Sequence, residues 1–197
     1  MNVAFGLKAH SGWAALVVLG GRGGALQVVE RCRMELVEKD ELSWAKQPYH
    51  AAEHLEGGDA RDLVRRGITS ARRIAVREMR AAVTRAREAG HTVAACGVLV
   101  TDPMPDWTVD EILAVHFRMH KAEGVLFRDV LARAAGACDL NLVAIPQKSL
   151  AAAAKGAREA IATLGKSVGP PWGKDQKEAA LAALIALESA DGTRRRR

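Results

Sequence analysis

The segment from Val93 to Val100 constrains the fold of this chain more than any other, because every residue in it is apolar or glycine. An uninterrupted apolar run of this length is typical of a central strand that is covered on both faces. Such strands belong to parallel or mixed sheets with helices packed on each side. The sequence therefore predicts an α/β fold.

Other segments predict the remaining strands and helices. Alternating or apolar runs predict three strands in a meander and one short late strand, at 3–8, 13–19, 26–36 and 142–145. The alternation of the third strand slips near Val29, which a β-bulge would absorb. Helical periodicity predicts helices at about 59–89, 109–135, 150–164 and 174–188. Asp59 is the expected N-cap of the first helix, and Gly90 ends it.

This order predicts a mixed five-stranded sheet, with a three-strand antiparallel meander plus two parallel strands, flanked by helices. The chain of 197 residues fits one domain, 1–190, followed by a basic tail, 191–197, that we expect to be disordered. Residues 20–24 are glycine-rich and predict a turn. The connection 38–58 has no clear pattern apart from one helical turn expected at 51–55, and connections of this length are often functional or mobile.

The cysteines and the hydropathy pattern indicate a cytoplasmic protein. The three cysteines are widely separated among apolar neighbours, which is typical of reduced core residues rather than of a disulfide framework or a metal site. The first residues do not resemble a secretory leader, and no apolar stretch is long enough for a membrane span. We therefore expect neither secretion nor membrane insertion.

Positive charge is concentrated in one predicted helix and in the tail. Between Ala60 and Gly90 there are nine arginines against three acidic residues, and the chain ends in four arginines. Four of the helical arginines recur every seven residues and so form a stripe along one face: Arg66, Arg73, Arg80 and Arg87. A stripe of this kind predicts contact with the phosphates of DNA or RNA, although a solvated helix face is the alternative interpretation. Aromatic residues make up 4% of the chain, which argues against a base-stacking platform.

A second group of residues could bind a metal ion. His116, His120 and Glu123 are spaced i, i+4 and i+7, so they share one helical face, and His10 in the turn after the first strand could add a ligand. Imidazole with carboxylate suits zinc or manganese. The alternative is a hydrogen-bonded structural cluster that anchors the helix to the 38–58 connection. His50 and His54 repeat the same spacing, with the same structural alternative.

The element order, together with the stretches GLKAHSGWAALVV and KDQKEAALAALIALE, resembles the ribonuclease H-like fold, and in particular the RuvC-type Holliday-junction resolvases. The resemblance implies a bacterial nuclease in which carboxylates on the first strand, at the end of the fourth strand and on the last helix hold two divalent metal ions, Mg²⁺ or Mn²⁺. Asp175 and Glu178, spaced i, i+3, match the last helix.

The other two positions depart from the family pattern. Lys8 stands where the resemblance implies an aspartate, and Asp102 comes one or two positions late on the fourth strand. An ammonium group would repel a metal ion or take its place. We therefore expect Lys8 to face the last helix and to pair with Asp175 or Glu178.

These observations leave three functional hypotheses. The first is a nucleic-acid-binding protein with a degenerate or rebuilt nuclease site. The second is a metal-dependent nuclease that uses the His/Glu/Asp groups, with Asp175, Glu178, Glu123 and His116 as candidate catalytic residues. The third is a phosphate- or nucleotide-binding protein, suggested by the turn 9–12, or a non-catalytic interaction module. A homodimer is compatible with each of them.

Overall fold

Five strands form one mixed sheet in the computed structural model, which describes residues 1–21, 26–153 and 156–194. The strands are β1 (Asn2–His10), β2 (Trp13–Gly20), β3 (Gln27–Glu35), β4 (Thr92–Val100) and β5 (Leu142–Pro146). Their order in the sheet is β3-β2-β1-β4-β5. β1, β2 and β3 pair antiparallel, whereas β4 pairs parallel with both β1 and β5. The predicted meander with two added parallel strands is thus confirmed.

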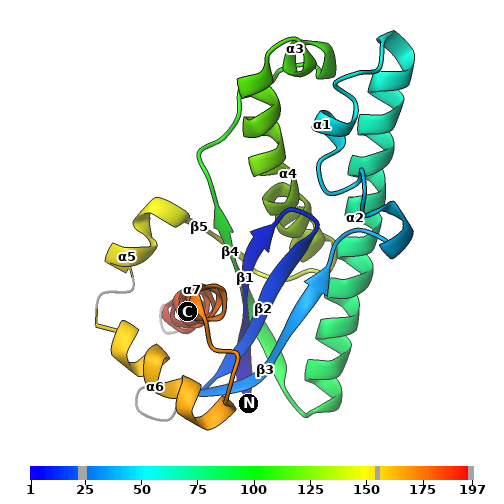
Figure 1. Cartoon of the computed structure of the whole chain (residues 1–197). Helices are drawn as coiled ribbons and strands as arrows, with labels where there is room; N and C mark the ends of the chain where they lie inside the picture. The colour runs from blue at the N-terminus through cyan, green and yellow to red at the C-terminus, as the bar shows by residue number, and fades with distance from the viewer. Residues whose placement is uncertain (22–25, 154–155, 195–197) are drawn as a thin grey trace.

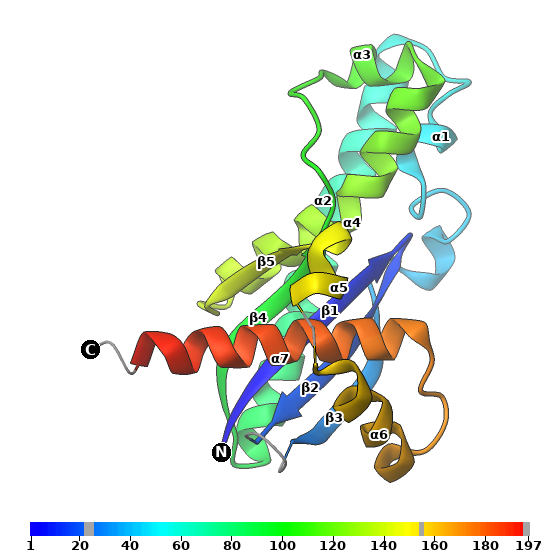
Figure 2. The same ribbon diagram turned by 90° about the vertical axis from the view of Figure 1, so that its left-hand side faces the viewer.

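Helices cover both faces of this sheet. The long helices α2 (Gly57–Glu88) and α4 (His116–Ala137) pack together on one face, around a core that includes Phe5 and Leu7. On the opposite face, α7 (Lys174–Arg194) runs across the strands, and α6 (Arg158–Val168) lies beside it (Figures 1 and 2). This three-layer arrangement explains the continuous apolar character of β4, which has helices on each side.

Close packing of α7 on the sheet depends on small residues. A Cβ atom added to Gly6 in β1 would overlap the carbonyl oxygen of Ala179, and one added to Gly97 in β4 would overlap that of Ala182. The facing side of α7 is itself rich in alanine. Ala179, Ala182 and Ala183 are fully buried. The helix backbone therefore lies directly on the two central strands, which holds the first turn of α7 close to the end of β1.

A helical extension projects beyond the sheet. It comprises the N-terminal halves of α2 and α4 together with the short helices α1 (Pro48–Ala51) and α3 (Val109–Leu113) (Figure 1). Its own small core contains Tyr49, Val64, Ile112 and Met119. The 38–58 connection, which the sequence left without a pattern, is therefore packed against α2 and α4 through α1.

Several predicted boundaries are corrected. α2 begins at Gly57, with Glu56 rather than Asp59 at the N-cap, so Asp59 lies in the first turn. The helical turn expected at 51–55 is α1, which begins at Pro48 because proline is favoured in a first turn. The predicted helix 109–135 is two helices, because Val115 has an extended backbone (φ −139°). The predicted helix 150–164 is also two, α5 (Leu150–Ala153) and α6, with Gly156 between them at φ 89°.

The predicted β-bulge and the predicted C-terminal tail have different outcomes. The bulge is confirmed, because Val18 pairs with Glu30 and Leu19 with Val28, leaving Val29 as the extra residue. The expected tail at 191–197 is helical as far as Arg194, and residues 195–197 lie outside the described residues, as do residues 22–24 of the predicted turn.

The chemistry of the cysteines and the hydropathy of the helices agree with the sequence. The three cysteines are free thiols, and burial raises the pKa of Cys96 to about 12, which makes it unreactive. None of the helices within the described part of the chain is long and apolar enough to cross a membrane.

Candidate functional site at the sheet edge

The alternation of β1 directs Lys8 towards α7. Val3, Phe5, Leu7 and Ala9 contribute to the core on the α2 and α4 side, so the intervening residues face the other way. Lys8 is 6% exposed, and its Nζ lies 2.5 Å from Oε2 of Glu178 in the second turn of α7. The predicted pairing of Lys8 with an acidic residue of the last helix is thus confirmed.

The next residue on this side of β1 contacts the other acidic residue of α7. His10 Nε2 lies 3.0 Å from Asp175 Oδ1, and both side chains are about one-third exposed. The imidazole of His10 stacks on Trp13 with ring centroids 4.3 Å apart. The guanidinium carbon of Arg33 lies 4.0 Å from the centroid of the Trp13 ring. Asp175 and Glu178 therefore each contact a basic side chain from β1.

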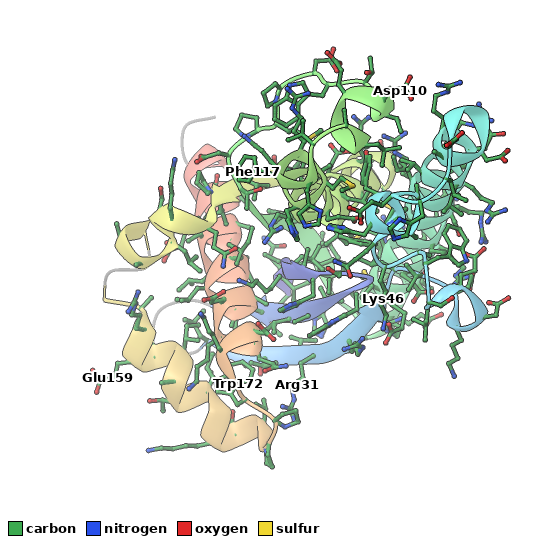
Figure 3. The ribbon with its side chains drawn as sticks, turned by 45° about the horizontal axis from the view of Figure 1, so that its top comes forward. Arg31, Lys46, Asp110, Phe117, Glu159 and Trp172 are labelled. Atoms are coloured by element: carbon green, nitrogen blue, oxygen red, sulfur yellow. The ribbon has the colours of Figure 1, made fainter. Side chains whose placement is uncertain are left out.

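The start of α7 is held in place by the segment that precedes it. Arg31 of β3, which is labelled in Figure 3, donates hydrogen bonds to the carbonyl oxygens of Val168, Pro170 and Pro171. Trp172 donates its indole N–H to the carbonyl oxygen of Ile161 at 3.0 Å. These contacts fix the approach to α7, and with it the positions of Asp175 and Glu178.

Asp102, the late acidic residue after β4, takes part in a different interaction. Its Oδ1 lies 2.7 Å from Nζ of Lys148, and both side chains are about 70% exposed. The hydrogen bond from Lys148 lowers the pKa of Asp102 below its usual value. Asp102 is thus engaged by Lys148 at the surface and not by the groups at the end of β1.

Three histidines meet in the helical extension. His116 and His120 lie on one face of α4, as predicted, with their Nε2 atoms 3.0 Å apart. His50, from α1, completes the group, and one ring nitrogen from each histidine lies within 4.8 Å of the others. His10 was predicted to join this cluster but instead contacts Asp175. His50 was recognised only as a repeated spacing, because nothing in the sequence places α1 against α4.

Glu123 lies beneath this group in a buried position. Its Oε1 accepts hydrogen bonds from the backbone N–H groups of Tyr49 at 2.8 Å and His50 at 3.3 Å. Burial raises the pKa of Glu123 to about 7, against the opposing effect of these two hydrogen bonds. Burial, and then the neighbouring His120 and His116, lower the pKa of His50. Glu123 thus anchors α1 to α4, as the structural interpretation of the cluster predicts.

A cavity of about 300 Å³ lies between the end of β1 and the histidine-bearing face of α4. Its lining includes His10 at the end of β1, Ser11 in the turn that follows, Gln47 of the connection, and several residues of α4, namely His120, Glu123, Gly124, Phe127 and Arg128. The predicted residues His10, His120 and Glu123 therefore share one cavity. His116 and Asp175 do not line it, but Asp175 contacts His10, which does.

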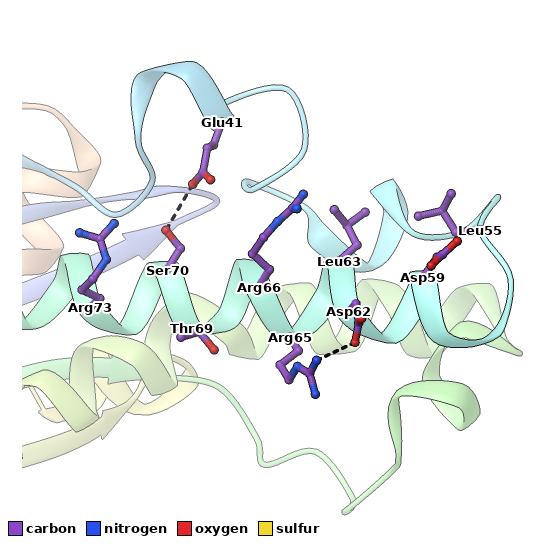
Figure 4. Close-up of a pocket in the computed structure, with 10 residues that line it drawn as sticks. All are labelled: Glu41, Leu55, Asp59, Asp62, Leu63, Arg65, Arg66, Thr69, Ser70 and Arg73. Atoms are coloured by element: carbon purple, nitrogen blue, oxygen red, sulfur yellow. Dashed lines mark hydrogen bonds and ion pairs between the residues drawn. The ribbon is translucent and has the colours of Figure 1, made fainter.

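The arginines of α2 are exposed, but most of them have acidic partners. Arg73 contacts Glu38 at 3.2 Å, and Arg66 lies 4.6 Å over the Trp44 ring. Acidic partners also lie within 4.0 Å of five other arginines of this helix: Arg61, Arg65, Arg72, Arg77 and Arg85. Arg66 and Arg73 line an open groove of about 780 Å³ between α2 and the connection (Figure 4). The predicted stripe is thus exposed but partly neutralised.

A second basic surface was not predicted from the sequence. A cleft of about 500 Å³ lies between α7 and the segment that contains α5 and α6, and three cationic residues line it: Arg158, Lys174 and Lys177. Glu178, the partner of Lys8, lines the same cleft. Among the described residues, no acidic partner contacts Arg158 or Lys177. These cations come from two helices and form no linear motif, so only the tertiary fold reveals them.

The sheet order and the helix that crosses it define a ribonuclease H-like α/β domain. Two solved structures of RuvC from Thermus thermophilus are similar to the whole chain. The first, in complex with a Holliday junction substrate, has a TM-score of 0.54 and 10% sequence identity over 98% of each chain. The second has a TM-score of 0.51 and 14% identity over 97% of each chain. No protein-family model and no curated protein matches the sequence. At this level of identity, the similarity establishes the fold.

Proposed function

We propose that this protein binds nucleic acid with a resolvase-like fold and does not hydrolyse it by the two-metal mechanism of that family. The observation that carries this proposal is the ion pair between Lys8 and Glu178, 2.5 Å long and largely buried. An ammonium group in this place neutralises one of the carboxylates that a divalent ion would require and repels the ion itself. The residues present therefore do not fit a two-metal site.

Two features support nucleic acid as the partner. One of the similar RuvC structures holds a Holliday junction substrate. In this chain, the cleft beside Glu178 is lined by Arg158, Lys174 and Lys177, and at least two of these cations are free to contact phosphates. The exposed arginines of α2 form another cationic surface. Phosphates could displace the acidic side chains from the weak ion pairs on it. A homodimer would double both surfaces, although the proposal does not depend on one.

Binding should be tight at low salt and should weaken steeply as salt is added, because each neutralised phosphate releases counterions. We expect Lys174→Ala/Lys177→Ala to weaken binding of junction and duplex DNA alike and to reduce the slope of log K against log salt by about 2. The measurement is fluorescence anisotropy with labelled junction, duplex and RNA between low and physiological salt.

Two further variants identify the surface that binds. Arg80→Ala/Arg87→Ala tests the arginine stripe, and Arg133→Ala, on α4 and paired with Asp129, is the control for loss of one positive charge. An unchanged slope in the α7 variant together with a reduced slope in the stripe variant would move the interface to α2. No binding of any substrate at low salt would refute the proposed function.

The same substrates should remain intact in the presence of Mg²⁺. With Lys8 in contact with Glu178, we expect no cleavage of junction, duplex or RNA above the level of an EDTA control. Gel electrophoresis of end-labelled substrates is the assay. Cleavage by the wild-type protein that Asp175→Ala abolishes would contradict the proposal, because it would mean that the acidic groups of α7 still hold catalytic metal ions.

A second candidate function is a metal-dependent nuclease built on the His/Glu groups. The cavity that His10, His120 and Glu123 share favours it, since this cavity adjoins Asp175 of α7 through His10. This nuclease should require Mn²⁺ more than Mg²⁺, because nitrogen ligands suit manganese better. Cleavage lost in His120→Ala but retained in Asp175→Ala would favour this function over binding alone.

A further inference from the structure

We propose that His50, His116 and His120 form a binding site for one transition-metal ion of the zinc class. This site lies in the helical extension and is separate from the pair of Lys8 and Glu178, so it does not depend on the proposed nucleic-acid function. It also differs from the predicted ligand set, because His50 takes the place of His10 and Glu123 is a supporting residue rather than a ligand.

The spacing of the imidazole nitrogens fits a shared ion. His116 and His120 are one helical turn apart on α4, and their Nε2 atoms are 3.0 Å apart. Two nitrogens bound tetrahedrally to zinc at about 2.0–2.1 Å would be separated by about 3.3 Å. His50 reaches the same point from α1, with its ligand atom within 4.8 Å of the other two. Only small side-chain shifts would bring all three nitrogens to one ion.

Two carboxylates lie beside the rings on the side away from the proposed ion. Glu53 Oε1 lies 3.3 Å from Nδ1 of His116, which leaves Nε2 of that ring to face His120. Glu123 Oε1 lies 3.6 Å from Nδ1 of His50, which is beyond hydrogen-bond distance but close enough for a small shift to let Nδ1 donate to it when Nε2 binds the ion. Metal-bound histidines usually direct their second ring nitrogen to a carboxylate in this way, which fixes the tautomer and the ring orientation.

A purely hydrogen-bonded cluster explains these contacts less well. His116 and His120 could share one proton between their Nε2 atoms, but His50 would gain nothing from that arrangement. Neither ring nitrogen of His50 has a hydrogen-bond partner among the described residues, although both are inaccessible to solvent. The Oε2 atom of Glu123, a residue 93% buried, is in the same situation. Buried polar atoms normally find partners, and a bound cation would provide one for His50 and offset the charge of Glu123.

The ligand set determines the class of ion. Three neutral imidazoles suit Zn²⁺, Co²⁺ or Ni²⁺, whereas Mg²⁺ and Ca²⁺ prefer oxygen ligands. Three protein ligands leave a fourth coordination position for water or a small ligand. Because His50 belongs to the 38–58 connection and the other two to α4, the ion would also hold the connection against the long helices.

The test is titration of the metal-stripped full-length protein with Zn²⁺ by isothermal calorimetry, and with Co²⁺ by visible absorption. We expect one ion per chain and the ligand-field bands of tetrahedral Co²⁺ without a thiolate charge-transfer band. His116→Ala or His120→Ala should reduce the affinity by about 100-fold or more. Glu123→Gln, which removes only an outer partner, should reduce it by about 10- to 100-fold.

Matched controls keep the outcome decisive. His54→Ala removes an exposed histidine from the same connection, and the affinity should change by less than about threefold. His116 is 61% exposed, so its truncation should leave the fold intact, which circular dichroism verifies. Absence of Zn²⁺ binding at micromolar concentration, unchanged affinity in both α4 variants, or a thiolate band in the Co²⁺ spectrum would each overturn the proposal.

Discussion

The substitution Gly6→Ala is expected to lower the free energy of unfolding by about 3 kcal/mol or more, although it adds a single methyl group. Overpacking a core usually costs about 1–3 kcal/mol, because side chains can rotate away. Here the added Cβ would meet the backbone of Ala179 and Ala183 rather than a flexible side chain. To relieve the overlap, α7 would have to lift from the sheet and break contacts along its length. Thermal unfolding should show a decrease in Tm of about 6–12 °C.

Gly136→Ala provides the matched control. Gly136 lies in the last turn of α4 and is exposed, and a Cβ atom added there meets nothing within 4 Å. Alanine at such a position should be neutral or stabilise the protein by up to about 1 kcal/mol, since it restricts the unfolded chain. If Gly6→Ala and Gly136→Ala gave the same Tm, the close packing of α7 on β1 would be wrong.

The sheet could be predicted because its signals are local. The apolar run of β4 needs no partner to be recognised, and the slip of alternation near Val29 shows the bulge directly. The crossing of α7 was not predicted in detail, because Gly6 and Gly97 are far apart in the sequence and their role depends on the helix backbone that meets both. The break at Val115 was missed for a related reason, since the apolar periodicity continues across it.

The candidate site was predictable where one element supplied the geometry. The i, i+4 spacing brings His116 and His120 together on α4, and the alternation of β1 directs Lys8 to the last helix. His50 joins the histidines only because α1 packs on α4, and no local pattern encodes that contact. The charge pattern of α2 correctly predicted that its arginines are exposed. It could not show that Glu30 of β3 and Glu38 of the segment that follows partly neutralise them, because these residues are distant in the sequence.

The ion pair between Lys8 and Glu178 should contribute strongly to stability when one partner is removed, and little when both are. Their side chains are 8% and 18% exposed, so the loss of one partner leaves a poorly solvated charge. We expect Lys8→Met or Glu178→Leu alone to cost about 3 kcal/mol. Lys174 lies 3.9 Å from Glu178 and compensates for part of this loss in the first variant.

The double variant Lys8→Met/Glu178→Leu should return to within about 1 kcal/mol of the wild type, because a well-packed apolar pair avoids the cost of desolvating two charges. Urea unfolding of the four proteins gives the coupling energy directly. The exposed pair of Asp62 and Arg65 is the control, and its double-mutant cycle should give less than about 0.5 kcal/mol. Additive losses in the Lys8 and Glu178 cycle would mean that the two groups do not interact in solution. Glu178 would then be free to bind a divalent ion, so Lys8 would no longer exclude a two-metal site.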